Sequence, residues 1–216
     1  MGGSVQKIVL ATRNRGKIAE LSAMLGPLDV EVVGLDAFPE IGEIPETGKT
    51  FEENALIKAR AVCQATGLPA LADDSGLVVD ALAGAPGVYS ARFAGERATD
   101  ADNNAKLLRE MATVPPERRS AHFVCVMAAV APNGATVTAR GTWDGEIARK
   151  PKGQGGFGYD PLFLDPELGM SAAELDPEQK NARSHRGRAL RKLMDIWPDF
   201  WKKISASPGS PGATEG

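Results

Sequence analysis

Two adjacent carboxylates, Asp73 and Asp74, interrupt an apolar stretch of the sequence at LADDSGL. Adjacent like charges repel, and a carboxylate beside a hydrophobic core is unfavourable unless a positive partner pairs with it. Successive side chains of a strand point to opposite faces, so the two carboxylates are expected to have different roles. One alternative is that both only form a turn, as Asp-Ser-Gly sequences often do. The functional interpretation has Asp74 bind a divalent cation together with a glutamate, while Asp73 is structural and hydrogen-bonds nearby backbone.

Glu46 is the glutamate that fits this interpretation. It precedes a helix that carries Asn54 and Lys58, which are four residues apart and therefore share a helix face. Mg²⁺ favours one or two carboxylates together with waters and substrate phosphates. The sequence has no His/Cys cluster of the kind that binds zinc. Taken singly, a loop glutamate and a helix lysine are ordinary solvated residues, so Glu46 and Lys58 become candidates only beside Asp74.

A second candidate site is an anion-binding loop near the start of the chain. The stretch ATRNRGKI leads from an apolar strand into a helix, where backbone N–H groups and the positive end of the helix dipole meet. It is not a Walker A loop, because the first glycine and the Lys-Ser/Thr ending are missing. An ordinary basic loop is the alternative. The candidate phosphate-binding residues are Thr12, Arg13, Asn14, Arg15, Gly16 and Lys17.

Two further stretches have side chains suited to a nucleotide. In GQGGFGYDPLF an aromatic ring lies among glycines, which allow close backbone approach, and an aromatic ring can stack on a base. In KNARSHRGRAL, donors surround a helix start, where they can bind a carbonyl or a phosphate. A small aromatic core and a solvated basic surface are the alternatives. The candidates here are Phe157, Gly158, Tyr159, Asp160, Lys180, His185 and Arg186.

The elements that must position these residues alternate between strand and helix. Apolar patterns predict strands at 7–11, 30–35, 71–79 (broken by the acidic pair), 120–131 and 136–143. Start and stop signals predict five helices. The first follows residues 12–16 and ends at Gly26-Pro27, and the second spans 51–65, with Thr50 and Glu53 as a capping box. The third begins at Thr99 and Asp102, the fourth opens with Asp176 and Pro177, and the last runs from Ser184 to Pro198. An Asn133-Gly134 turn marks an antiparallel hairpin. The predicted fold class is therefore α/β with a long mixed sheet and flanking helices.

Composition narrows the class of protein. The chain has 216 residues, 43% of them hydrophobic, and residues 6–204 are expected to form one domain between disordered segments at 1–5 and 205–216. A net charge of −3 gives no basic field for nucleic acid. The sequence contains no long apolar segment, so neither secretion nor a membrane span is expected. Cys63 and Cys125 lie in apolar surroundings and are expected to be buried thiols in a reducing cytoplasm.

Six motifs, in this order, resemble the inosine triphosphate pyrophosphatase family, whose members hydrolyse deaminated purine nucleoside triphosphates. They are T-x-N-x-x-K from Thr12, ETGKTFEENALIKA from Glu46, ADDSGL from Ala72, GAPGVYSARF from Gly84, GGFGYDPLF from Gly155 and SHRGRAL from Ser184. The resemblance implies two lobes with the active site in the cleft between them, and a homodimer. It also implies Mg²⁺-dependent hydrolysis of ITP, dITP or XTP to the monophosphate and pyrophosphate.

The resemblance also implies a role for each matching residue. Residues 12–17 would hold phosphate, and Lys58 is expected there too. Glu46 and Asp74 would hold Mg²⁺, with Asp74 also the proton acceptor. The residues implied to contact the nucleotide are Ser75, Phe157, Gly158, Tyr159, Asp160, Lys180, His185 and Arg186.

Two other functions remain as alternatives. A non-catalytic nucleotide sensor would keep the phosphate loops but could lack the metal carboxylates, and both Glu46 and Asp74 are present here. A pyrophosphatase for modified pyrimidine nucleotides could be built on a similar two-lobed fold. The pair His185 and Arg186 argues for purines instead.

Overall fold

The centre of the protein is a seven-stranded sheet in the order β2-β1-β3-β4-β5-β6-β7. The structure is a computed structural model that describes residues 6–25 and 30–205. β1 pairs in parallel with β2 and β3, whereas the remaining neighbours are antiparallel, so the predicted mixed α/β sheet is confirmed. The strands are β1 (Gln6–Leu10), β2 (Val30–Gly34), β3 (Ala70–Val79), β4 (Ser120–Val130), β5 (Thr136–Ile147), β6 (Phe163–Asp165) and β7 (Met170–Ser171).

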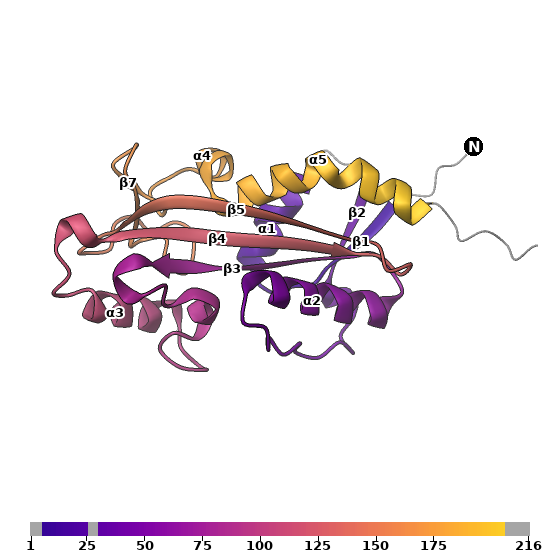
Figure 1. Cartoon of the computed structure of the whole chain (residues 1–216), viewed down its shortest axis with the longest axis horizontal. Coiled ribbons are helices and arrows are strands. Elements are labelled where there is room, and N and C mark those ends of the chain that lie inside the picture. Colours follow the sequence, from indigo (N-terminus) through magenta and orange to yellow (C-terminus); the bar gives the residue numbers. More distant parts are fainter. Residues whose placement is uncertain (1–5, 26–29, 206–216) are drawn as a thin grey trace, which may run out of the picture.

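Helices cover both faces of this sheet. Figure 1 shows α4 and α5 on one side of the long strands β4 and β5, and α2 and α3 on the other. The α-helices are α1 (Arg15–Leu25), α2 (Phe51–Thr66), α3 (Asp100–Glu110), α4 (Pro177–Arg183) and α5 (His185–Ser205). A short 3₁₀ segment, η3 (Gly87–Arg92), packs against β3.

The two faces of β3 belong to different hydrophobic clusters. Leu71 packs with Met127 and with residues of α5, whereas Ala70 and Ala72 pack with residues of α2. This alternation is the period of two that any strand imposes. It places Asp73 on the side of α5 and Asp74 on the side of α2, so the prediction that the two side chains point to opposite faces is confirmed. A third cluster, which includes Leu107 of α3 and Phe163 of β6, fills the far end of the sheet.

Three predicted boundaries are wrong. β5 does not end at Trp143 but continues to Ile147. β3 is not broken by the acidic pair but runs unbroken from Ala70 to Val79, because each carboxylate has a cationic partner and neither has to leave the strand. The last helix does not end at Pro198 but continues to Ser205 with Pro198 inside it. Phe200, Trp201 and Ile204 pack on the core beyond the proline, and this burial offsets the lost hydrogen bond.

Most local signals are confirmed. Thr99 with Asp102, and Asp176 with Gln179, form reciprocal capping boxes, and Asn133-Gly134 closes the hairpin. Cys63 and Cys125 are free and buried. The predicted box at Thr50 is half wrong. Thr50 accepts from the Glu53 N–H, but the Glu53 carboxylate accepts from the Lys49 N–H.

Some expectations lie outside the described residues. These are the helix stop at Gly26-Pro27, the segment 1–5 and all of the predicted tail 205–216 except Ser205, which is the last residue of α5. Within 6–25 and 30–205, no helix has both the length and the apolar character that crossing a membrane would need.

Candidate active site

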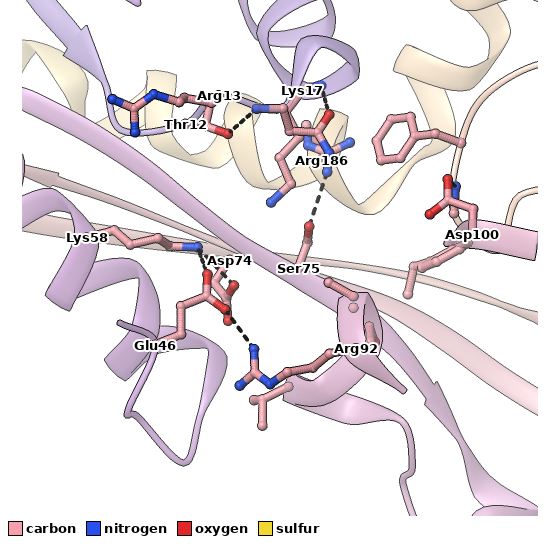
Figure 2. Close-up of a pocket in the computed structure, with 18 of the residues that line it drawn as sticks. Thr12, Arg13, Lys17, Glu46, Lys58, Asp74, Ser75, Arg92, Asp100 and Arg186 are labelled. Carbon is pink, nitrogen blue, oxygen red and sulfur yellow. Dashed lines mark hydrogen bonds and ion pairs between the residues drawn. The ribbon is translucent and has the colours of Figure 1, made fainter. Parts of the chain in front are cut away.

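One pocket of about 670 Å³ brings the predicted stretches together, a volume in the ordinary range for ligand sites. Figure 2 shows Thr12, Arg13 and Lys17 on one side, Glu46, Lys58 and Asp74 on another, and Ser75 with Arg186 between them. All of the predicted site residues line it except Arg15 and Gly16. The side chain of Arg15 lies outside what the structure describes.

Asp74 and Glu46 converge on a single ammonium group. The Lys58 Nζ lies 2.7 Å from Glu46 Oε1 and 3.0 Å from Asp74 Oδ1. Asn54, one helical turn before Lys58 on α2, donates to Asp74 Oδ2 at 3.3 Å and fixes the carboxylate from its other side. The positive partner of Asp74 that the structure contains is therefore Lys58, and the ETGKTFEENALIKA stretch supplies both the loop and the helix that surround it.

Burial and shared cations set the charge states of this cluster. Burial raises the pKa of Asp74 despite the attraction of Lys58, and the nearby Glu46 carboxylate raises it further. Burial also acts to raise the pKa of Glu46, but Lys58 and the more distant cations lower it below its usual value. For Lys58, burial acts against the charge, yet Asp74, Asp73 and Glu46 together raise its pKa. Glu46 and Asp74 therefore share the Lys58 charge, and Arg92 adds a second cation beside Glu46.

Asp73 binds cations on the opposite face of β3. Its fully buried carboxylate lies 2.9 Å from the Lys17 Nζ and 3.5 Å from the Arg186 Nε, and Ser75 donates to it at 3.3 Å. Burial disfavours its charge, but Lys17 and Arg186 hold its pKa well below the usual range. The expected hydrogen bond between Asp73 and backbone is wrong, because Oδ2 binds these side chains and Oδ1 has no hydrogen-bond partner among the described residues. Asp73 thus ties α1 and α5 to the central sheet.

The phosphate-loop candidate is built as a capped helix start. The Asn14 side chain accepts from the Lys17 N–H at 3.1 Å, and Thr12 Oγ1 accepts from the Asn14 N–H at 3.2 Å. Arg13 lines the pocket, but its guanidinium donates to the carbonyls of Ile41 and Gly42 and so holds the loop before α2. Lys17 reaches Asp73. The loop therefore presents the start of α1 to the pocket, the arrangement that suits an anion.

The aromatic loop contacts this helix start directly. A Cβ at Gly16 would lie 2.8 Å from Phe157 Cδ1, so the glycine allows the ring to pack on α1. The Lys180 Nζ is 5.1 Å and the Arg186 Cζ 5.6 Å from the centroid of the ring. Asp160 accepts from the Phe157 N–H and from Lys180, and the buried Tyr159 hydroxyl donates to the Ser90 carbonyl. Tyr159 and Asp160 support the loop that carries Phe157.

His185 is buried at the base of the pocket. Its ring stacks on Phe123 at 4.7 Å between centroids, and its Nδ1 has no hydrogen-bond partner among the described residues. Burial lowers its pKa well below 6.5, and the charges of Arg186 and Lys180 lower it further, so the imidazole is neutral near pH 7. A Cβ at Gly141 of β5 would overlap the His185 carbonyl oxygen and the Ala189 nitrogen, so the first turn of α5 rests directly on the strand.

Sequence reasoning missed three residues of the site. Asn54 was noted only for its spacing from Lys58. Arg92 of η3 lies 3.6 Å from Glu46 Oε2, and its only signal was its place in the GAPGVYSARF motif. Asp100 also lines the pocket, but an acidic residue in the first turn of a helix is so common that its sequence gave no signal.

Comparison with known proteins agrees with this geometry. Residues 8–196 match the Ham1 family. A protein of Nitratidesulfovibrio vulgaris named dITP/XTP pyrophosphatase is 60% identical over 201 residues, which are 90% of this chain and 97% of that protein.

Solved structures agree as well. A HAM1 protein from Coxiella burnetii is 48% identical with a TM-score of 0.83, covering 90% of this chain and 99% of that one. A nucleoside-triphosphatase / dITP/XTP pyrophosphatase from Mycobacterium abscessus is 53% identical with a TM-score of 0.73, covering 88% and 99%. The resemblance drawn from the six motifs is confirmed, and the chain belongs to the Ham1 family.

Proposed function

We propose that this protein hydrolyses deaminated purine nucleoside triphosphates (ITP, dITP and XTP) to the monophosphate and pyrophosphate. One observation carries the proposal: two carboxylates, Glu46 and Asp74, meet on one cation in a pocket that also contains an exposed helix start and an aromatic ring. A nucleoside triphosphate needs all three features, for its metal, its phosphates and its base. The names of the relatives agree with this substrate class.

Glu46 and Asp74 are the residues that would hold Mg²⁺. Their oxygens already converge on the Lys58 ammonium, and oxygen donors of this kind suit a hard cation. The described residues contain no group of three or more acidic, His or Cys side chains placed for a metal, so water and substrate phosphates would complete the coordination. When bound, the ion supplies positive charge to the triphosphate and acidifies the attacking water.

The residues of the chain itself provide the remaining chemistry. Thr12, Asn14 and the start of α1 bind phosphate oxygens, and the Lys58 ammonium at the pocket wall contacts them as well. Asp74, oriented by Asn54, accepts a proton from water. Attack breaks the bond between the α and β phosphates, so pyrophosphate leaves intact.

The base end of the site is formed by Phe157, His185 and Arg186. Phe157 stacks on the purine, and Arg186, which has only donors, faces the oxygen at purine position 6. An amino group at that position, as in ATP, would place donor against donor in a buried site. Sites built on such hydrogen bonds can reject the mismatched analogue by roughly 10⁴-fold.

A nucleotide panel tests the function. The enzyme is incubated with ITP, dITP, XTP, GTP, ATP and a modified pyrimidine triphosphate in Mg²⁺, and pyrophosphate and orthophosphate are assayed separately. We expect pyrophosphate from the deaminated purines, little turnover of ATP, and no turnover in excess EDTA. Stepwise release of orthophosphate, or a preference for the pyrimidine, would refute the proposal.

We also propose that the protein is a cytoplasmic homodimer without a nucleic-acid partner, and that the cleft between two lobes is the pocket described above. The family resemblance supports these points. Light scattering at micromolar concentration tests the association state, and the mass of a single 22.7 kDa chain would contradict the dimer.

A further inference from the structure

We propose that Asp100 and Asn104 of α3 are positioning residues for the base end of the site. Together they bind both polar atoms of the Gly158 backbone and thereby hold the neighbouring Phe157 ring in place. Neither residue belongs to the six motifs. The inference rests on the proposed function, because it assumes that Phe157 stacks on the base of a bound nucleotide.

The geometry is that of a two-point clamp. Asp100 Oδ2 accepts from the Gly158 N–H at 2.7 Å, and Asn104 Nδ2 donates to the Gly158 carbonyl at 2.8 Å. The two side chains are four residues apart, so they project from the same face of α3. Figure 2 shows Asp100 on the side of the pocket opposite Lys58 and Glu46.

The loop around Phe157 requires such a clamp because its glycines allow the backbone many conformations. Gly156 and Gly158 both have left-handed backbone, with φ of 72° and 63°. Glycine loses more conformational freedom on ordering than any other residue, so external contacts must hold this segment in one conformation. Asp160 secures the loop from within by accepting from the Phe157 N–H. Asp100 and Asn104 secure the next residue from outside.

The helix that carries the clamp is itself fixed. Buried Asn103 accepts from the Ala94 N–H at 2.8 Å and donates to the Ala91 carbonyl at 3.1 Å. Leu107 and Met111 are fully buried in the core at that end of the sheet. The clamp therefore connects Gly158 to a rigid part of the fold. Since a Cβ at Gly16 would nearly touch Phe157, any shift of the loop moves the ring against α1 or away from the pocket.

The two clamp residues differ in a way that gives a sharp test. Asp100→Asn keeps an oxygen that can accept from the Gly158 N–H, whereas Asp100→Ala removes it. Asn104→Asp is nearly isosteric but replaces the donor with an acceptor that faces a carbonyl oxygen. If the clamp positions Phe157, Asp100→Asn should change ITP binding only slightly. Asp100→Ala, Asn104→Ala and Asn104→Asp should weaken ITP binding.

The experiment measures KM and kcat for ITP in these four variants, together with the inhibition constant of inorganic tripolyphosphate and the melting temperature. We expect KM to rise about tenfold in the impaired variants, the scale of one lost hydrogen bond to a charged or buried group, with a smaller change in kcat. Tripolyphosphate has no base, so its inhibition constant should stay within about twofold of wild type. Glu110→Ala, an exposed position at the end of α3, is the matched control.

Three results would overturn the clamp: an unchanged KM in Asp100→Ala, equal damage in Asp100→Asn and Asp100→Ala, or a parallel loss of tripolyphosphate binding. The proposed function is tested separately, by which nucleotide the wild-type enzyme hydrolyses. If that nucleotide is not a deaminated purine, the variant-to-wild-type KM ratio for the nucleotide it does hydrolyse still tests the clamp. If none is hydrolysed, ITP affinity by calorimetry replaces KM.

Discussion

Asp73 and Asp74 are neighbours in β3, yet their carboxylates lie on opposite faces of the sheet and their pKa values are shifted in opposite directions. Asp73 binds Lys17 and Arg186, and its pKa is lowered. Asp74 shares Lys58 with Glu46, and its pKa is raised. The folded protein therefore favours the charge of Asp73 and disfavours that of Asp74. The first carboxylate holds the fold, and the second is available for chemistry.

Neutral substitutions at these two positions should change stability by different amounts. Asp73→Asn leaves two cations without their counter-ion in a buried site and should cost about 3 kcal/mol of unfolding free energy, the scale for breaking a buried pair. Asp74→Asn removes a charge that burial disfavours and leaves Lys58 paired with Glu46, so it should cost less stability than Asp73→Asn. Urea unfolding at pH 7 in a chelator measures both. A larger loss in Asp74→Asn than in Asp73→Asn would contradict this assignment.

The pH dependence of stability should identify Asp73. A depressed pKa contributes stability that is present above the unfolded-state value of about 4 and is lost as pH falls below it. Wild type should therefore lose stability more steeply than Asp73→Asn as the pH is lowered through this range. The raised pKa of Asp74 has the opposite sign, because it favours folding as its carboxylate is protonated. Unfolding free energies at a series of pH values compare the three proteins.

The two predicted metal carboxylates should be separable by kinetics. Asp74→Asn loses both a cation ligand and the base, so we expect kcat to fall by at least about 10²-fold. Glu46→Gln loses only a ligand, so the Mg²⁺ concentration for half-maximal rate should rise more than kcat falls. Glu40→Gln, an exposed carboxylate in the same loop that does not line the pocket, is the control. Wild-type activity in Asp74→Asn would remove Asp74 from the mechanism.

Base choice should depend on Arg186 and His185. Arg186→Ala and His185→Ala should lose ITP turnover more than residual ATP turnover and so narrow the ratio of the two kcat/KM values. Arg188→Ala is the matched control, since Arg188 lies on the same helix turn and donates to the Thr142 carbonyl of β5. A ratio that is unchanged in both variants would show that neither residue contacts the base edge.

The ratio of kcat/KM for ITP to kcat/KM for ATP should not depend on pH near neutrality. Burial and the adjacent cations lower the pKa of His185 well below 6.5, so the ring is already neutral and does not titrate between about pH 6 and 8. Measuring kcat/KM for ITP and ATP at half-unit steps checks this. A step in the ratio near pH 6.5 would mean that His185 is charged at lower pH in the working enzyme.

The sequence predicted the strands and helices well where the local chemistry was strong. Caps at Thr99 and Asp176 and the turn at Asn133-Gly134 depend on neighbouring residues alone, and all three are confirmed. The predicted break in β3 failed because the partners of its acidic pair, Lys17 and Lys58, belong to distant helices. Pro198 was misread as a stop because the burial of Phe200 is a tertiary effect.

The candidate site residues were predicted mainly from the motifs. The contacts between those residues were not predicted. Spacing indicated Asp74, Lys58 and Phe157 as candidates. It could not show that Lys58 binds Glu46, because a loop and a helix meet there only in three dimensions. The role of Asp100 was even harder to predict. Its partner is a backbone N–H of Gly158, 58 positions away, and backbone groups leave no signature in side-chain patterns.

Direct contact between Gly141 and the first turn of α5 has a consequence for the size of the site. Gly141 has no side chain to separate the strand from the helix, so the contact between their main-chain atoms helps to define how deep His185 and Arg186 lie. A single added methyl group would lift this turn and make the pocket shallower without altering any polar group that faces the ligand. Gly141 therefore contributes to the depth of the pocket without contributing a polar group to it.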